Sequence, residues 1–171
     1  MDRNIILKPG DIFCTRNPML LGRAICFFEK LHAKDNQAEY SHAGIILSGN
    51  GETFEALWTN RRQNLWEAYK GQKVLIGSHK NMTAEAFVKG WDGIKKYEGQ
   101  WYAGWRLFLH MMPFLSKIGT GGFAVCSELA GKFIEKSGIY EEFYWKGRNP
   151  DDIADMIHNW KGWTMIYEGE I

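Results

Sequence analysis

The stretch over residues 40–58, YSHAGIILSGNGETFEALW, constrains the fold more than any other part of this sequence. Two runs rich in β-branched, aromatic and other apolar residues flank the tetrapeptide SGNG at residues 48–51. An Asn-Gly pair between two such runs is a strong short-range signal for a β-hairpin. The chain is therefore expected to contain an antiparallel sheet.

The register of this hairpin decides which side chains share a face of the sheet. If the turn comprises residues 48–51, Glu55 lies opposite Gly44. His42 then lies diagonal to Glu55 on the same face, where a long side chain can still reach it. Any loop with an even number of residues keeps the two side chains on one face, whereas a one-residue slip separates them.

Capping and turn residues indicate where the remaining elements begin and end. Thr83 is a candidate N-cap, Gly138 suits the position after a helix, and Asn149 followed by Pro150 is a strong helix start. With no internal repeat or linker visible, we expect one α+β domain over residues 1–171. The expected elements are strands at 10–15 and 73–77, and helices at 18–33, 83–97, 126–137 and after residue 149.

The balance of charges excludes one class of partner. The chain has 21 basic and 20 acidic side chains and no basic stripe, so no nucleic-acid partner is expected. The first residues, MDRNIILKPG, lack the apolar run of a signal peptide, and nothing resembles a transmembrane segment. We therefore expect a cytoplasmic protein, although a phage or released lysis protein would have the same features.

Residues 101–115, WYAGWRLFLHMMPFL, are apolar on every side of the helix that their spacing predicts. Such a helix is either buried or in contact with an apolar partner. With eight tryptophans in the chain, a large aromatic core is the simpler interpretation. Peripheral contact of this segment with lipid is the alternative interpretation.

Cys126 follows a glycine-rich run and begins a predicted helix. Three cysteines without a C-x-x-C motif argue against a disulfide framework and against a cysteine-rich zinc site. Cys14 and Cys26 fall inside apolar elements, where core packing explains them. At a helix N-terminus, free N–H groups and the macrodipole favour a thiolate. Cys126 is therefore either a nucleophile or a small buried hydrophobe.

A nucleophilic cysteine requires a base, and His42 is the candidate among five histidines. It opens an otherwise apolar strand, and Glu55 on the same face would orient its imidazole and stabilise the cation. The competing interpretation is a cross-strand polar pair on a half-exposed sheet. The other histidines have simpler explanations: a helix C-terminus for His32, a solvated loop for His79, core packing or a second site role for His110, and an exposed position for His158.

Three segments in chain order, YSHAGIIL, TFEAL and AVCSELAGKF, resemble a known family. They are similar to the circularly permuted, YiiX-like branch of the NlpC-like papain-fold proteins, in which the histidine strand precedes the cysteine helix. GDIF and NPDDIAD match the opening strand and the closing helix of that family. The lecithin:retinol acyltransferase relatives share the general plan, so a permuted papain-like fold is expected.

The resemblance implies Cys126 as nucleophile, His42 as general base and Glu55 as the orienting residue, with no metal or organic cofactor. The family often has a Tyr-Asp pair before the cysteine, where this sequence has Tyr102 followed by Ala103. This departure bears on the substrate more than on the chemistry. The predicted substrate-binding residues are Tyr40, Tyr102 and Ser127.

The sequence thus predicts a cysteine hydrolase, a peptidase or amidase, that attacks an amide or ester carbonyl through an acyl-enzyme intermediate. Family resemblance suggests peptide or peptidoglycan substrates, whereas residues 101–115 suggest an acyl-lipid substrate and an acyltransferase or lipid amidase. A catalytically silent binding module of the same fold is a further alternative. A remote alternative is a zinc site in which Cys126, His42 and Glu55 are three ligands and one coordination position stays open.

Overall fold

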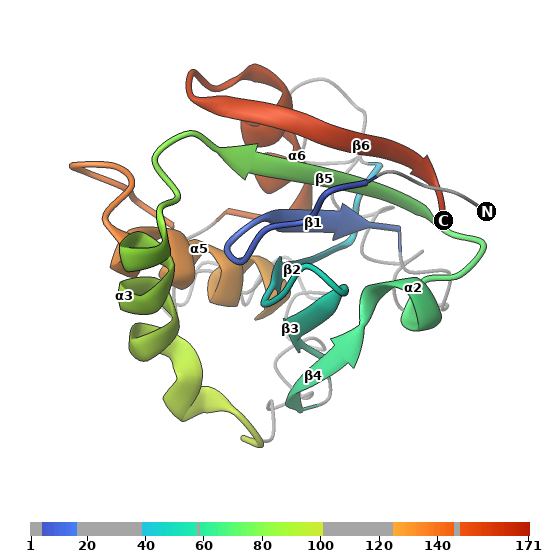
Figure 1. The fold of residues 1–171 in the computed structure, drawn as a ribbon, viewed down its shortest axis with the longest axis horizontal. Coiled ribbons are helices and arrows are strands. Elements are labelled where there is room, and N and C mark those ends of the chain that lie inside the picture. The colour runs from blue at the N-terminus through green and yellow to red at the C-terminus, as the bar shows by residue number, and fades with distance from the viewer. Residues whose placement is uncertain (1–4, 17–38, 58, 101–124, 146–147) are drawn as a thin grey trace, which may run out of the picture.

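A computed structural model describes residues 5–16, 39–57, 59–100, 125–145 and 148–171. Within these ranges the chain has an α+β architecture around a six-stranded antiparallel sheet (Figure 1). The strand order across this sheet is β4-β3-β2-β1-β5-β6. The strands are β1 (Ile12–Thr15), β2 (His42–Ile46), β3 (Glu52–Ala56), β4 (Asn60–Asn64), β5 (Lys73–His79) and β6 (Trp163–Glu170).

Helices pack against the centre and one end of this sheet. Helix α5 (Val125–Ser137) packs against α3 (Ala84–Ile94) and against β2, and Figure 1 shows α3 and α5 side by side. Helix α6 (Pro150–Asn159) packs against β6 and β1. The short helix α2 (Leu65–Ala68) joins β4 to β5, and a 3₁₀ turn, η1 (Lys95–Tyr97), continues α3.

Both faces of the central strands are buried, which explains the apolar run in β2. Ala43 and Ile45 belong to the core that the sheet shares with α5 and α6. Ile46 belongs to a second cluster, with Phe13 and Leu65, on the opposite face. Because alternate residues of a strand share a face, His42 points to the side of Ile46, away from the main core.

The predicted hairpin is confirmed in its register. β2 and β3 are antiparallel, with Gly44 opposite Glu55 and Ile46 opposite Thr53. The turn closes with Gly51 at a φ of 88°, a conformation that favours glycine. His42 and Glu55 therefore lie on one face, as the even loop length predicts.

The helix boundaries follow the predicted capping residues. Thr83 caps α3 by accepting a hydrogen bond from the Ala86 N–H, and Gly138 follows α5 with a φ of 70°. Asn149 and Asp152 form a reciprocal capping box at the start of α6. Because these signals are local, they identify the ends of these helices without any knowledge of the fold.

Strands β4 and β6, the two edge strands of the described sheet, were not predicted from the sequence. The sequence of β4 is NRRQN, which contains no apolar residue, so alternation of apolar and polar residues could not reveal it. It is a strand because all five of its residues pair with β3. Polar edge strands are common, since charged side chains there discourage pairing with other chains.

Several predictions concern residues outside the described ranges. These are the helix at 18–33, the apolar segment 101–115, and the residues Cys26, His32, Tyr102 and His110. Within the part of the chain that the structure describes, no helix has both the length and the apolar character needed to cross a membrane.

Candidate active site

His42 and Glu55 form a buried pair on the second face of the sheet. The His42 Nε2 atom lies 2.8 Å from the Glu55 Oε2 atom, and the side chains are 5% and 0% exposed. The hairpin register places the two residues diagonally, so the pair follows from the pairing of β2 with β3. This degree of burial disagrees with the alternative prediction of a polar pair on a half-exposed sheet.

Two hydroxyl groups complete the surroundings of the Glu55 carboxylate. Thr53 donates to Oε1, and Tyr69, which follows α2, donates to Oε2. Burial raises the pKa of Glu55, but the His42 imidazole and these hydroxyls outweigh it and hold the pKa below the usual value. Glu55 is therefore an ionised, fully hydrogen-bonded carboxylate whose orientation is fixed.

Gly44 leaves the space that this carboxylate occupies. A Cβ atom at Gly44 would lie 2.4 Å from Phe13 Cε1 and 2.9 Å from Glu55 Cγ, which is closer than real contacts allow. The glycine two residues after His42 therefore has a packing role. The ring of Phe13 also contacts those of His42 and Tyr69, at centroid distances of 6.1 Å and 5.5 Å.

Cys126 lies in the first turn of α5, where that helix meets the start of β2. Its Sγ atom is 4.0 Å from the carbonyl oxygen of Ser41. The backbone N–H groups of Ala43 and Ser127 both donate to the sulfur. The pairing of β2 with β3 ends at Gly44, so Ala43 lies one residue beyond it, although it still pairs with β1.

The surroundings of Cys126 favour an ion pair with His42. Burial raises the pKa of the Cys126 thiol, but the charge and hydrogen bond of His42, with the two N–H donors, bring it below the usual value. Burial lowers the pKa of His42, yet Cys126 and Glu55 raise it above its ordinary value. Glu55 occupies Nε2, so we infer that Nδ1 is the nitrogen available to the sulfur. The arrangement therefore favours a thiolate beside an imidazolium.

Cys14 provides an internal contrast with Cys126. Its side chain is fully buried, its thiol lies 3.7 Å from the carbonyl oxygen of Pro150, and burial raises its pKa well above the usual value. Cys14 is therefore a core residue, as its position in an apolar strand predicts. Cys126 is the thiol in the described part of the chain whose pKa is lowered.

The interpretation of His79 as a solvated loop residue is wrong. His79 ends β5 and is 4% exposed, with its ring against those of Tyr140 and Trp163 at 5.0 Å and 5.3 Å. Its Nδ1 atom accepts a hydrogen bond from the Asn81 N–H. The segment GSHKN is polar, which favoured a loop, but its histidine is the last residue of a strand and packs against aromatic rings. His158 is exposed on α6, as predicted.

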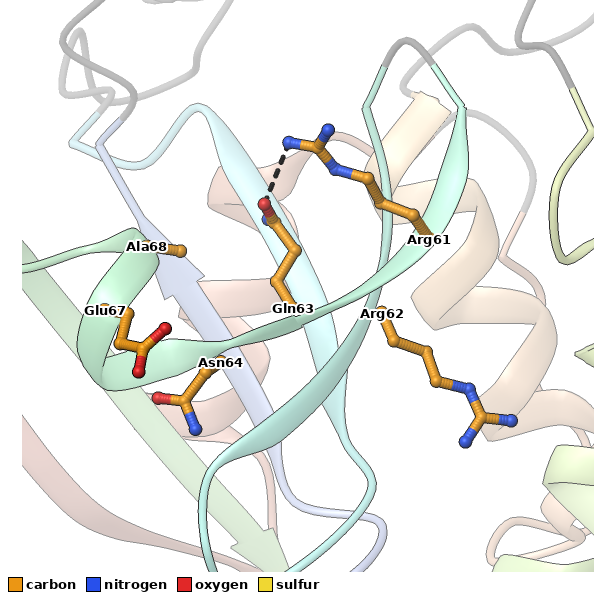
Figure 2. A pocket seen from close by; sticks show the side chains of 6 residues that line it. All are labelled: Arg61, Arg62, Gln63, Asn64, Glu67 and Ala68. Carbon is orange, nitrogen blue, oxygen red and sulfur yellow. Dashed lines mark hydrogen bonds between the residues drawn. The ribbon is translucent and has the colours of Figure 1, made fainter.

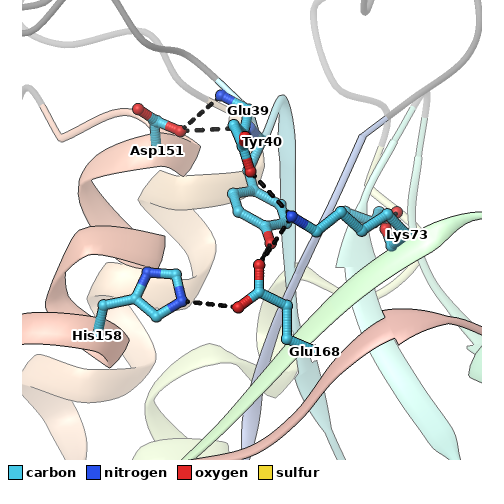
Figure 3. A network of polar contacts seen from close by, with 7 residues as sticks. Glu39, Tyr40, Lys73, Asp151, His158 and Glu168 are labelled. Carbon is cyan, nitrogen blue, oxygen red and sulfur yellow. Dashed lines mark hydrogen bonds and ion pairs between the residues drawn. The ribbon is translucent and has the colours of Figure 1, made fainter.

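Two of the predicted substrate-binding residues lie within the described ranges. Tyr40 is 2% exposed, and its hydroxyl donates to Glu168 at 2.8 Å, among the polar contacts drawn in Figure 3. Ser127 is buried, and its hydroxyl donates to the carbonyl oxygen of Arg148 at 2.7 Å. Both side chains thus have internal partners, and their contact with a substrate stays a prediction.

Thr53 and Tyr69 are the site residues that the sequence analysis missed. Thr53 stands two residues before Glu55, so the two-residue period of a strand already placed it on the same face. Tyr69 had no such signal, because it follows α2, a helix of four residues that the sequence did not predict. Its contact with Glu55 depends on how the chain folds back from β4.

The donors at this site do not fit a metal ion. Zinc sites direct three or more donors at one point. Here Glu55 binds Nε2 of His42, which leaves Cys126 to the other ring nitrogen, so the imidazole separates the thiolate from the carboxylate. Elsewhere in the described ranges, too, no three His, Cys, Asp or Glu side chains are grouped to hold a metal.

Comparison of the sequence with protein-family profiles and with curated proteins finds no match. Comparison with solved structures finds several, among them the crystal structure of the metalloprotein YiiX from Escherichia coli O157:H7, described under DUF1105. The similarity covers 96% of this chain and 98% of YiiX, with a TM-score of 0.60 and 15% sequence identity. The chain therefore has a YiiX-like α+β fold around its antiparallel sheet.

Proposed function

We propose that this protein is a cysteine hydrolase of the peptidase or amidase type, built on a permuted papain-like plan. The observation that carries the proposal is the chain of contacts from Cys126 through His42 to the buried carboxylate of Glu55. A nucleophile, a base and a group that orients the base are the three parts of a catalytic triad. The order of the parts along the sequence, with His42 before Cys126, agrees with the permuted plan.

In the proposed reaction, the thiolate of Cys126 attacks a carbonyl carbon. A carbon–sulfur bond forms, and the electron pair of the carbonyl π bond moves to the oxygen. The C–N or C–O bond then breaks, and the leaving group takes the proton from the His42 imidazolium. A water molecule next attacks the thioester while His42 accepts its proton. The acid product departs as the carbon–sulfur bond breaks, which restores the thiolate–imidazolium pair.

The first turn of α5 supplies the means to stabilise the negative oxygen. Free N–H groups at a helix N-terminus carry partial positive charge and need no reorganisation during the reaction. The N–H of Cys126 is in this turn, next to the Ser127 N–H that already donates to the sulfur. We assign the oxyanion to this backbone, which agrees with the family resemblance of the AVCSEL segment.

Glu55 serves as the orienting residue in this scheme. Its three hydrogen-bond donors are His42, Thr53 and Tyr69, so its carboxylate keeps one position while His42 gains and loses a proton. A peptide or peptidoglycan amide is the proposed substrate, with no cofactor in the scheme. The alternative of an acyl-lipid substrate rests on residues 101–115, which lie outside the described ranges.

The test is to trap the acyl-enzyme. The protein is mixed with p-nitrophenyl acetate, release of p-nitrophenolate is followed, and the acylated residue is located by mass spectrometry after acid quench. The expected result is a burst equal to the enzyme concentration with the acetyl group on Cys126, abolished in Cys126→Ala and His42→Ala.

The matched control is His158→Ala, because His158 also pairs with a glutamate, Glu168, but joins α6 to β6 near the surface. It should retain the full burst. Acylation scattered over surface residues, or a burst that persists in Cys126→Ala, would favour the silent binding module instead. Once acylation is established, peptide amides and phospholipid vesicles separate the two substrate classes.

A further inference from the structure

Two neighbouring arginines on the edge strand β4 have different partners. The Arg62 guanidinium binds Glu98 at 2.8 Å and Glu52 at 3.2 Å, and it lies 5.1 Å from the centroid of the Trp91 ring. Arg61 instead donates to the neutral amide oxygen of Gln63 at 2.8 Å. Within the described ranges, no carboxylate lies within ion-pairing distance of Arg61. Among the described residues, the positive charge of Arg61 therefore has no acidic partner and is available to a ligand.

Arg61 shares a face of the sheet with the candidate triad. In the pairing of β3 with β4, Arg61 lies opposite Glu55 and Gln63 lies opposite Thr53. Residues directly opposite in an antiparallel pair project from the same face, with Cβ atoms roughly 5 Å apart. The hydroxyl of Tyr69, which binds Glu55, lies within electrostatic range of both Arg61 and Cys126. The cation thus borders the proposed catalytic site.

A hollow of about 440 Å³ opens beside this cation. It is shallow and open to solvent, so it suits one terminal group of a ligand and does not enclose a whole ligand. Figure 2 shows the hydrogen-bonded side chains of Arg61 and Gln63 at one end of this hollow. Glu67 and Ala68 of α2 line its opposite end. A carboxylate would be repelled at the Glu67 end, so the charges orient an anionic ligand with its negative group at Arg61.

We propose that Arg61 and Gln63 form a carboxylate-binding subsite for the substrate, a proposal that rests on the proposed hydrolase function. The planar fork of a guanidinium matches the two oxygens of a carboxylate, which gives geometric specificity as well as charge. The Gln63 oxygen accepts from Arg61, which leaves its amide N–H groups to donate to the same anion. The substrate class is a peptide or acyl amide that carries a free carboxylate within about three residues of the scissile bond.

The experiment compares matched alkylating probes instead of substrates. Iodoacetyl-glycine, iodoacetyl-diglycine and iodoacetyl-triglycine are prepared with a terminal carboxylate and with a terminal carboxamide. In each case the Cys126 sulfur displaces iodide, and the rate is read by peptide mass spectrometry. Successive glycines move the terminal group outward by roughly 3.3–3.6 Å each, so the series samples the span from sulfur to Arg61.

The expected result is that one probe length reacts about fivefold faster as the carboxylate than as the carboxamide, the upper range for a partly exposed ion pair. The preference should vanish in Arg61→Gln and persist in the matched control Arg62→Gln. It should also shrink in 1 M salt, where a charge pair is screened. Equal rates at every length in the wild type, or a preference that survives Arg61→Gln, would overturn the subsite.

A failure of the hydrolase proposal gives a different pattern. In that case every probe modifies Cys126 at the same rate in wild type and His42→Ala, whatever its terminal group. The subsite is then tested with fluorescent acetyl-triglycine in its carboxylate and carboxamide forms, by anisotropy titration. Tighter binding of the carboxylate that depends on Arg61 supports the subsite, and equal binding of both forms to wild type and Arg61→Gln overturns it.

Discussion

The described part of the chain contains two histidine–glutamate pairs, and they differ in burial and in the partners of the glutamate. His42 and Glu55 are 2.8 Å apart and 5% and 0% exposed. His158 and Glu168 are 3.2 Å apart and 33% and 26% exposed. The first pair adjoins a thiol whose pKa is lowered, whereas the second joins α6 to β6 near the surface.

The partners of the two glutamates explain the difference. Glu55 accepts from the neutral hydroxyls of Thr53 and Tyr69, so His42 is the cationic partner among its described hydrogen-bond donors. Glu168 binds the Lys73 ammonium at 2.8 Å and the Tyr40 hydroxyl (Figure 3). Lys73 thus satisfies Glu168 whatever the state of its histidine. The two pairs therefore differ in the charge of the other donors to the glutamate. Glu55 has neutral donors besides His42, whereas Glu168 already has the Lys73 ammonium.

The largest expected difference concerns stability. Glu55→Gln should lower the free energy of unfolding by about 3 kcal/mol, because it removes the charge that a buried imidazolium needs. Glu168→Gln should cost less than about 1 kcal/mol, because its partners are partly exposed. Urea denaturation of both variants at pH 7 measures the contrast. Equal losses would mean that burial does not distinguish the two pairs.

Close packing around the buried pair gives the next effect. Gly44→Ala should cost about 2 kcal/mol, because the added Cβ would overlap Phe13 and the Glu55 side chain. Gly49→Ala is the control, since the nearest atom to its added Cβ is the Leu7 carbonyl oxygen at 3.4 Å. Thermal unfolding of the two variants tests the prediction, which fails if Gly49→Ala is the more destabilised.

How far the site was predictable depends on whether its signals were local. His42 and Glu55 were predictable on one face of a hairpin from the Asn-Gly signal and the two-residue period of strands, and within reach of each other on the condition that the turn comprises residues 48–51. Cys126 was predictable as a helix start, but its proximity to β2 required the family resemblance. Tyr69 was not predictable, since α2 is too short for a helical period to appear. The aromatic packing of His79 was not predictable either, because its neighbours in sequence are polar and the rings that it contacts come from distant parts of the chain.

A tyrosine donates to the glutamate of each pair, which allows a matched and smaller test. Tyr69→Phe should cost about 1.5 kcal/mol, because it removes a donor from a buried carboxylate. Tyr40→Phe should cost about 0.5 kcal/mol, because Lys73 and His158 remain to bind Glu168. Chemical denaturation at constant pH compares them, and a larger loss for Tyr40→Phe would contradict the account.

The smallest effect is a pH dependence of the second pair. Hydrogen bonding to Lys73 is the main cause that lowers the pKa of Glu168, from 4.5 to about 2. A carboxyl group with a lowered pKa stabilises the fold above its unfolded pKa, and this contribution is lost as the pH falls through the folded value. The difference in unfolding free energy between wild type and Glu168→Gln should be constant above pH 6 and shrink between pH 4.5 and pH 2. A difference that stays constant down to pH 2 would refute the assigned shift.

The most direct test of the central claim is the rate of iodoacetamide alkylation at Cys126 between pH 5 and pH 9, in wild type, His42→Ala and His158→Ala. We predict fast modification at pH 6 in wild type and His158→Ala, and a rate about 100-fold lower in His42→Ala, whose thiol ionises only at higher pH. If Cys126 in all three proteins reacts only as the pH passes the range of an ordinary thiol, His42 does not activate it and the hydrolase proposal is wrong.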